Sequence, residues 1–167
     1  MAGLVEIDTS YGLDRSNESL GVVPFVDVYD AVDPNNAVFQ DALRSGITTL
    51  HIAQGNNCTI AGMSRIVRPL GMMVEDMTVR PDAGLKVSIS PRSGQNPITH
   101  MAELRKAFSD LQDHVETVAE RLYEEDQKKK GEQVLVPPDE AVKEGLKLLK
   151  VSALDSKWRN LYRLQAG

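Results

Sequence analysis

The sequence has little of several features that mark particular classes of protein. It contains one cysteine, Cys58, so no disulfide can form within the chain, which favours a reducing compartment. Aromatic residues make up only 5% of the chain, so the core should consist mostly of aliphatic side chains and Met. No run of 18 apolar residues is present, so we expect no membrane-spanning helix. Lys and Arg number 19 against 24 Asp and Glu, and a net charge of −5 argues against a nucleic-acid surface.

What the sequence does contain is typical of a globular protein. Its 167 residues are 41% hydrophobic and 26% charged, which predicts a single domain over residues 1–167 with a sizeable core. The first residues show neither the basic segment nor the apolar segment of a signal peptide, so we expect a cytoplasmic location. Cys58 has no base next to it in the sequence, which favours an inert thiol over a nucleophile.

The N-terminal half reads as alternating strands and one helix. We predict a strand at 3–7, a helix at 36–44 that ends before Gly46, and a buried strand at 47–53. Helix, Gly and buried strand in this order form the unit of an α/β fold. The stretch 22–32 has strand-like composition, but Pro24 favours an edge or an extended loop. Further strands are expected at 64–68, 72–79 and 84–90, the last bounded by Pro81-Asp82 and Pro91.

The C-terminal half reads as helical. Seven apolar residues recur at alternating spacings of three and four: Met101, Leu104, Phe108, Leu111, Val115, Val118 and Leu122. This pattern predicts a long amphipathic helix over 98–128, which either packs on its own domain or pairs with a partner helix. A linker at 129–136, a helix at 139–150 and a short C-terminal helix containing Trp158 should follow.

Several short motifs occur in the order found in one enzyme family. They are G-L-V-E-I at 3–7, D-A-V-D-P at 30–34, G-I-T-T at 46–49, Q-G-N-N at 54–57, A-G at 61–62, G-L-K-V at 84–87, T-H-M at 99–101 and P-P-D at 137–139. With these motifs the chain resembles the amidohydrolase superfamily, in particular the imidazolonepropionase-like metal-dependent hydrolases, over residues 3–150. The resemblance implies an α/β fold: a partial (β/α) TIM-barrel-like unit with a β-rich insertion and a long amphipathic helix.

The chain departs from the family at the metal site. The resemblance implies a divalent metal such as zinc, bound by a His-x-His pair at the end of the first strand, but here Asp8 and Ser10 occupy those positions. No histidine lies in 155–165, where a second pair is expected. A complete TIM barrel also needs about 250 residues. The sequence therefore assigns no catalytic residue, no metal ligand and no cofactor to this chain.

Three other features are weaker candidates. His51 lies within a strand, where a buried, hydrogen-bonded imidazole is favoured over a metal ligand. Lys86 matches a strand position that some amidohydrolases use for a carbamylated lysine, although a surface or ion-paired lysine is favoured here. Residues 55–62 form either an anion-binding loop or a structural crossing, with the crossing favoured. His100 and His114 are expected at the surface. No Ser–His–Asp arrangement can be read from spacing, which leaves open one assembled in space.

These features leave two hypotheses for function. The first is an amidohydrolase-like protein, related to hydrolases of non-peptide C–N bonds but inactive or incomplete as an isolated chain. The second is a non-catalytic subunit or interaction module that associates through its long helix and an exposed sheet edge, as a homo-oligomer or with a complementary barrel subunit. Whether the chain is a fragment, a split subunit or a degenerate relative stays open, as do its substrate and whether it is an enzyme.

Overall fold

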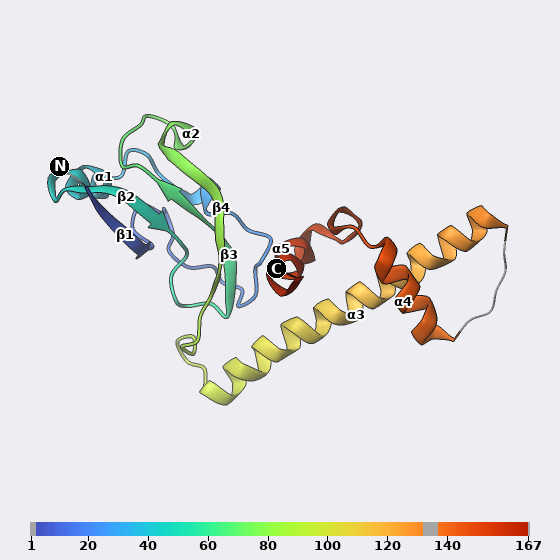
Figure 1. The fold of residues 1–167 in the computed structure, drawn as a ribbon. Coiled ribbons are helices and arrows are strands. Elements are labelled where there is room, and N and C mark those ends of the chain that lie inside the picture. Colours follow the sequence, from blue (N-terminus) through green and yellow to red (C-terminus); the bar gives the residue numbers. More distant parts are fainter. Residues whose placement is uncertain (1–2, 132–136, 167) are drawn as a thin grey trace. The chain divides into compact units, whose positions relative to one another are not determined.

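The computed structural model describes residues 3–131 and 137–166 and has a mixed α/β architecture (Figure 1). The chain divides into two compact units, Met1–Leu104 and Arg105–Gly167, with the boundary inside the long helix α3. The two units are described separately below. The prediction of one domain over residues 1–167 stays a prediction. Within the described ranges, no helix combines the length and the apolar character that a membrane span requires.

A four-stranded sheet in the order β1-β2-β3-β4 forms the first unit. The strands are β1 (Leu4–Thr9), β2 (Ile47–Ile52), β3 (Ile60–Val67) and β4 (Thr78–Val87). The pair β1–β2 is parallel, whereas β2–β3 and β3–β4 are antiparallel, so β1, β2 and β4 run in the same direction. Their carboxyl ends therefore lie at the same end of the sheet, called the carboxyl edge below, where side chains from distant parts of the sequence meet.

One face of this sheet carries the hydrophobic core. Leu50, Ile52 and Val67 project from β2 and β3 against short helices: η1 (Val28–Ala31), α1 (Ala37–Arg44) and α2 (Val74–Met77). As predicted, helix α1 begins and ends with local signals. The Asn36 side chain accepts a hydrogen bond from the Val38 N–H, and Gly46 has φ +82°. Strand β2 is buried on one face only, whereas the sequence had predicted a buried strand.

Three predictions for the middle of the chain need correction. Residues 72–79 do not form one strand, because α2 occupies Val74–Met77 and buries Met77 in the core, and strand β4 begins only at Thr78. Strand β4 continues through Pro81 and Asp82 instead of starting after them. Its register gains two residues between Arg80 and Gly84, so Pro81 lies in a bulge of an edge strand, where a missing N–H is tolerated. Strand β3 begins at Ile60, four residues before the predicted start.

Residues 22–27 follow the expectation set by Pro24, whereas 28–31, also predicted as an edge strand or extended loop, form a 3₁₀ helix. Residues 22–27 make two isolated parallel bridges to β3, Val22 to Ile60 and Asp27 to Met63, before the 3₁₀ helix η1. Gly62 of β3 permits this close approach, since a Cβ there would lie 2.2 Å from the Val26 carbonyl oxygen.

The predicted helices of the C-terminal half are confirmed. They are α3 (Pro97–Lys130), α4 (Pro138–Leu148) and α5 (Ser156–Ala166), with the 3₁₀ helix η2 (Val151–Ala153) before α5. Helix α4 crosses α3 closely, because a Cβ on Gly145 would lie 2.0 Å from the Ala119 carbonyl oxygen (Figure 1). Of the predicted linker, Lys129 and Lys130 belong to α3, and residues 132–136 lie outside the described residues.

Candidate functional site

A β-bulge near the end of β1 sets the direction of the side chains at the carboxyl edge of the sheet. Glu6 pairs with Leu50 and Thr9 pairs with Ile52, so β1 has one residue more than β2 in this interval. Ile7 and Asp8 therefore both lie opposite His51, on the face of the sheet away from the core. Bulges often occur beside functional sites because they turn a side chain that regular pairing would send to the other face.

Asp8 forms an ion pair with Lys86 across the sheet. The Lys86 ammonium lies 3.0 and 2.9 Å from the two Asp8 carboxylate oxygens. The Lys86 side chain is largely buried, whereas that of Asp8 is more than half exposed. These residues belong to the two outer strands, which three spacings of about 4.8 Å would separate in a flat sheet. Side chains stand roughly perpendicular to a sheet, so those of two strands this far apart can touch only if the sheet curves. The contact between Asp8 and Lys86 therefore indicates that the sheet curves towards this face.

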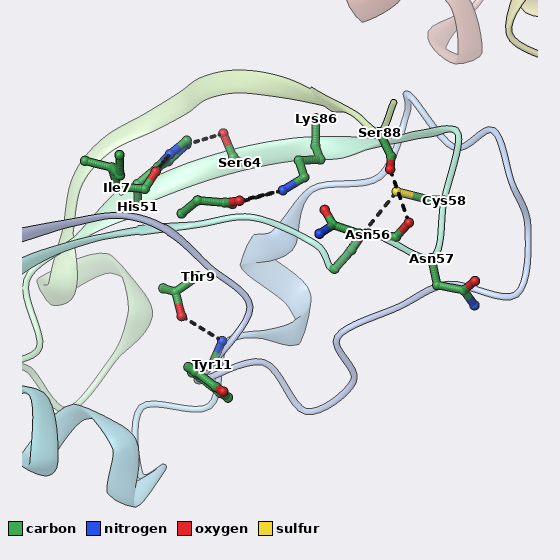
Figure 2. A network of polar contacts seen from close by, with 12 residues as sticks. Ile7, Thr9, Tyr11, His51, Asn56, Asn57, Cys58, Ser64, Lys86 and Ser88 are labelled. Carbon is green, nitrogen blue, oxygen red and sulfur yellow. Dashed lines mark hydrogen bonds and ion pairs between the residues drawn. The ribbon is translucent and has the colours of Figure 1, made fainter. Parts of the chain in front are cut away.

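His51 lies beside this ion pair and uses both ring nitrogens. Nδ1 lies 2.8 Å from the Ile7 carbonyl oxygen, and Nε2 lies 2.7 Å from the Ser64 hydroxyl (Figure 2). The Ser64 hydroxyl is also 2.9 Å from the carbonyl oxygen of Gly84. His51 is hydrogen-bonded but only half-buried, whereas the sequence favoured a buried, hydrogen-bonded imidazole.

These side chains line a cavity of about 320 Å³. Its polar wall consists of Asp8, His51, Ser64 and Lys86, and its apolar wall includes Ile7 and Leu85. A second cleft of about 530 Å³ lies between α1 and the first two strands. Asp8 and Lys86 also reach this cleft, together with Ser10 and the buried Gln54.

The residues at the carboxyl edge do not fit a divalent metal. Both oxygens of Asp8 are bound to an ammonium group, whose positive charge would repel a metal ion at the same place. Ser10 is a poor ligand and lies in the larger cleft. Within residues 3–131 and 137–166, no three His, Cys, Asp or Glu side chains converge as a metal site would require. Lys86 adopts the ion-paired arrangement.

The segment 55–62 packs against the loop that follows β1. The N–H groups of Gly55 and Asn57 donate to the Ser16 carbonyl and the Asn17 side chain, and that of Gly62 donates to Gln54. These N–H groups donate hydrogen bonds within the protein, as expected for a structural crossing, and are therefore not free to bind an anion.

The Cys58 thiol is held within this crossing. It is buried and donates to the Gly55 carbonyl oxygen at 3.2 Å. Burial raises the pKa of the Cys58 thiol, an effect that the positive charges of Lys86 and Arg92 only partly oppose. A thiol with a raised pKa is a poor nucleophile, in line with the inert interpretation.

His100 is fully buried, so the prediction of a surface residue was wrong. Its Nε2 donates to the Ser88 carbonyl oxygen at 2.9 Å, and its Nδ1 lies 3.4 Å from the Thr59 hydroxyl. That hydroxyl donates to Glu103 at 2.7 Å. His100 in the first turn of α3 bonds to Ser88 and Thr59, which lie 12 and 41 residues earlier in the chain, and no local pattern reveals these partners. His114 is only half-buried, and its Nε2 accepts from the Asp155 N–H at 3.3 Å.

Glu103 is the negatively charged residue of this buried network. Partial burial alone would raise the pKa of Glu103, but hydrogen bonds from Thr59 and Gln95 and the positive charge of Arg92 outweigh burial and lower it. The network joins the first turn of α3 to the start of β3 and the segment after β4, so its role is to hold the first unit together.

Comparison with known proteins shows a likeness of fold. The structure is similar to that of an amidohydrolase from Thermotoga maritima, with a TM-score of 0.59 and 22% sequence identity. The match covers 87% of this chain and 41% of the amidohydrolase, so this chain spans less than half the length of that protein. Neither a protein-family model nor a curated protein matches the chain.

Ser64 lines the cavity but was not among the site residues predicted from the sequence. Ser64 lies in the strand I-A-G-M-S-R-I-V, where a polar residue with 1% exposure needs a partner. Ser64 and Arg65 are two polar residues in an otherwise apolar run, which was a signal, but the sequence gave no indication that His51 would be the partner of Ser64.

Proposed function

We propose that this chain is a divergent relative of the amidohydrolases, the hydrolases of non-peptide C–N bonds, and forms part of a (β/α) barrel. Three observations support the proposal: the likeness of fold, the order of the family-like motifs along the chain, and the curvature of the sheet towards its polar face. The β3–β4 hairpin is then the β-rich insertion. The cytoplasmic location expected from the sequence stays a prediction.

The observation that carries the functional proposal is the ion pair between Asp8 and Lys86. In the resembling family, the position of Asp8 holds the first metal-binding histidine. Here a carboxylate occupies it and an ammonium supplies the positive charge. The described site therefore performs no metal-dependent hydrolysis on its own, and the chain is inactive or incomplete as a metal hydrolase.

Zinc binding tests this proposal directly. The purified wild-type chain, titrated with zinc by calorimetry and assayed for bound metal after dialysis, should hold less than about 0.1 equivalent. The triple variant Asp8→His, Ser10→His, Lys86→Met restores the family's pair and removes the ammonium group that would repel the metal. It should bind zinc measurably, because two imidazoles then project from one strand end. Ser109→His is the matched control, since it adds an imidazole on an exposed position of α3. One equivalent of zinc in the wild type, lost in Asp8→Asn, would contradict the proposal.

A second candidate function is association through the edge of the sheet. Strand β1 is an outer strand, and its side chains Leu4, Val5 and Ile7 are 62%, 62% and 77% exposed. An exposed apolar edge strand favours pairing with another chain. We propose that this edge receives a second copy of the chain or a complementary barrel subunit, and that α3 takes part.

Light scattering coupled to size exclusion tests self-association. The wild type should elute as a dimer or larger species between about 5 and 100 μM, and Val5→Lys should shift it to the monomer. Val79→Lys on the opposite outer strand, β4, is the control and should leave the dimer unchanged. A wild-type monomer throughout this range would rule out the homo-oligomer.

A further inference from the structure

We propose that Ser64 and His51 form a metal-independent acyl-transfer site that accepts short-chain acyl esters. The two residues lie on adjacent strands, 13 positions apart in the sequence, and their side chains meet at 2.7 Å on the polar face of the sheet. A serine hydroxyl within hydrogen-bond reach of an imidazole, itself oriented by a third group, is the arrangement that activates a serine nucleophile.

The backbone carbonyl of Ile7 is the orienting group. A carbonyl oxygen can only accept, so Nδ1 of His51 carries a proton and donates it at 2.8 Å. In the neutral imidazole, Nε2 then has a free lone pair, and it faces the Ser64 hydroxyl. The bulge in β1 places this carbonyl, because it sets Ile7 opposite His51.

The Gly84 carbonyl gives the hydroxyl hydrogen a second acceptor at 2.9 Å. When the imidazole is doubly protonated, Nε2 donates to Ser64 and the hydroxyl hydrogen turns to Gly84. When the imidazole is neutral, the hydroxyl donates to Nε2 instead. The neutral state is therefore the reactive one, and the same three atoms accommodate both states without moving the backbone.

Ser64 has 1% exposure as a residue, so a substrate reaches it only through the cavity of about 320 Å³ that it lines. Gly84 keeps this approach open, since a Cβ there would lie 3.7 Å from the Ser64 hydroxyl oxygen and would partly cover it. The cavity wall also contains Ile7, Ala53, Leu85 and Val87. Its size and aliphatic lining suit an acyl chain of a few carbons.

The chemistry follows from this geometry. The Ser64 oxygen attacks the ester carbonyl carbon, its proton passes to His51 Nε2, and the carbonyl π electrons move onto the carbonyl oxygen. The adduct collapses, the C–O bond to the alcohol breaks, and the leaving alkoxide takes the proton from Nε2. Water then attacks the acyl-serine with the same base, releasing the carboxylic acid and restoring Ser64. No metal, oxidant or reductant is needed.

Covalent labelling of the intact chain tests the proposal. A small alkyl fluorophosphonate should modify the folded wild type at Ser64, located by peptide mass spectrometry, as the Oγ–P bond forms and fluoride leaves. Labelling at Ser64 should also be slower while p-nitrophenyl butyrate is present in excess, because the ester acylates the same oxygen until water releases it. The proposal is overturned if the folded wild type stays unlabelled at Ser64, or if labelling occurs only after denaturation.

Variants separate a catalytic pair from a structural hydrogen bond. His51→Gln should lower the rate of labelling by about a hundredfold, because it removes the base. Gly84→Ala should leave the fold intact, since the added Cβ meets only an ordinary contact, yet lower the rate about tenfold by covering the hydroxyl. Ser109→Ala, an exposed serine on α3, should label as the wild type does. Equal rates in wild type, His51→Gln and Gly84→Ala would show that Ser64 and His51 have only a structural role.

This inference does not rest on the proposed function. The zinc experiment can contradict the proposed function while Ser64 is still labelled. If Ser64 is not labelled, the acyl-transfer site is excluded, and the argument from Asp8 and Lys86 is unaffected.

Discussion

The two faces of the four-stranded sheet are built from the same strands but have different roles. On one face, Leu50, Ile52 and Val67 are closed off by η1, α1 and α2. On the other, His51 and Ser64 bond to each other beside the Asp8–Lys86 ion pair and line a cavity. Side chains alternate between faces along a strand, so neighbouring residues such as His51 and Ile52 have opposite roles. Stability should therefore depend mainly on the first face and chemistry on the second.

The largest effect should come from a pair of isoleucine substitutions on opposite faces. Ile52→Ala should lower the free energy of unfolding by about 2–5 kcal/mol, because Ile52 is fully buried in the core. Ile66→Ala is the matched variant on the half-buried face and should cost about 1 kcal/mol. Urea denaturation followed by circular dichroism measures both, and equal losses would contradict the division of roles between the faces.

Two glycines in adjacent strands offer the next comparison. Gly62→Ala should destabilise the protein by about 1–3 kcal/mol, because the new Cβ would lie 2.2 Å from the Val26 carbonyl oxygen and force the backbone apart. Gly84→Ala meets nothing closer than 3.7 Å and should be neutral or stabilising by up to about 1 kcal/mol. Thermal and urea unfolding of the two variants should rank them in this order, and a reversed order would mean that 22–27 does not run along β3.

The buried network around Glu103 should give the first unit a dependence on pH. Because the folded pKa of Glu103 lies below the ordinary value, its stabilisation is complete above about pH 4.3 and is lost as the pH falls through the folded pKa. Glu103→Gln should cost about 1.5 kcal/mol at pH 7 and flatten the acid side of the stability profile. The exposed Glu18→Gln is the control, and it should leave that profile unchanged.

The smallest effect should come from the ion pair between Asp8 and Lys86. Asp8 is more than half exposed, so a double-mutant cycle of Asp8→Asn and Lys86→Met should give a coupling energy of about 0.2–1 kcal/mol. This coupling should weaken in 1 M NaCl, because salt screens exposed charges. A coupling above about 2 kcal/mol, insensitive to salt, would mean that the pair is part of the structural core and would weaken the division between the faces.

Much of the helical structure could be predicted because its signals are local. The spacing of Met101, Leu111 and Val118 on one helical face predicted α3, and Asn36 and Gly46 predicted both ends of α1. The prediction failed at 72–79, where burial of Met77 in the core favoured a short helix over the strand that local composition suggested. It also failed at Pro81, since an outer strand can accommodate a residue without an N–H in a bulge.

The site was less predictable than the fold. The sequence identified Asp8, His51 and Lys86 one at a time, by motif or residue type, but gave no reason to group them. His100 was wrongly expected at the surface, because the residues that bury it come from distant segments.

The sequence by itself determined that α1, α3, α4 and α5 are helices and where α1 begins and ends, because these features depend on neighbours a few residues apart. Only the tertiary structure decided that Lys86 reaches Asp8 across 78 positions and that Ser64 meets His51. Strand order, register and a bulge of one residue fix those distances, and each is set by packing across the whole sheet.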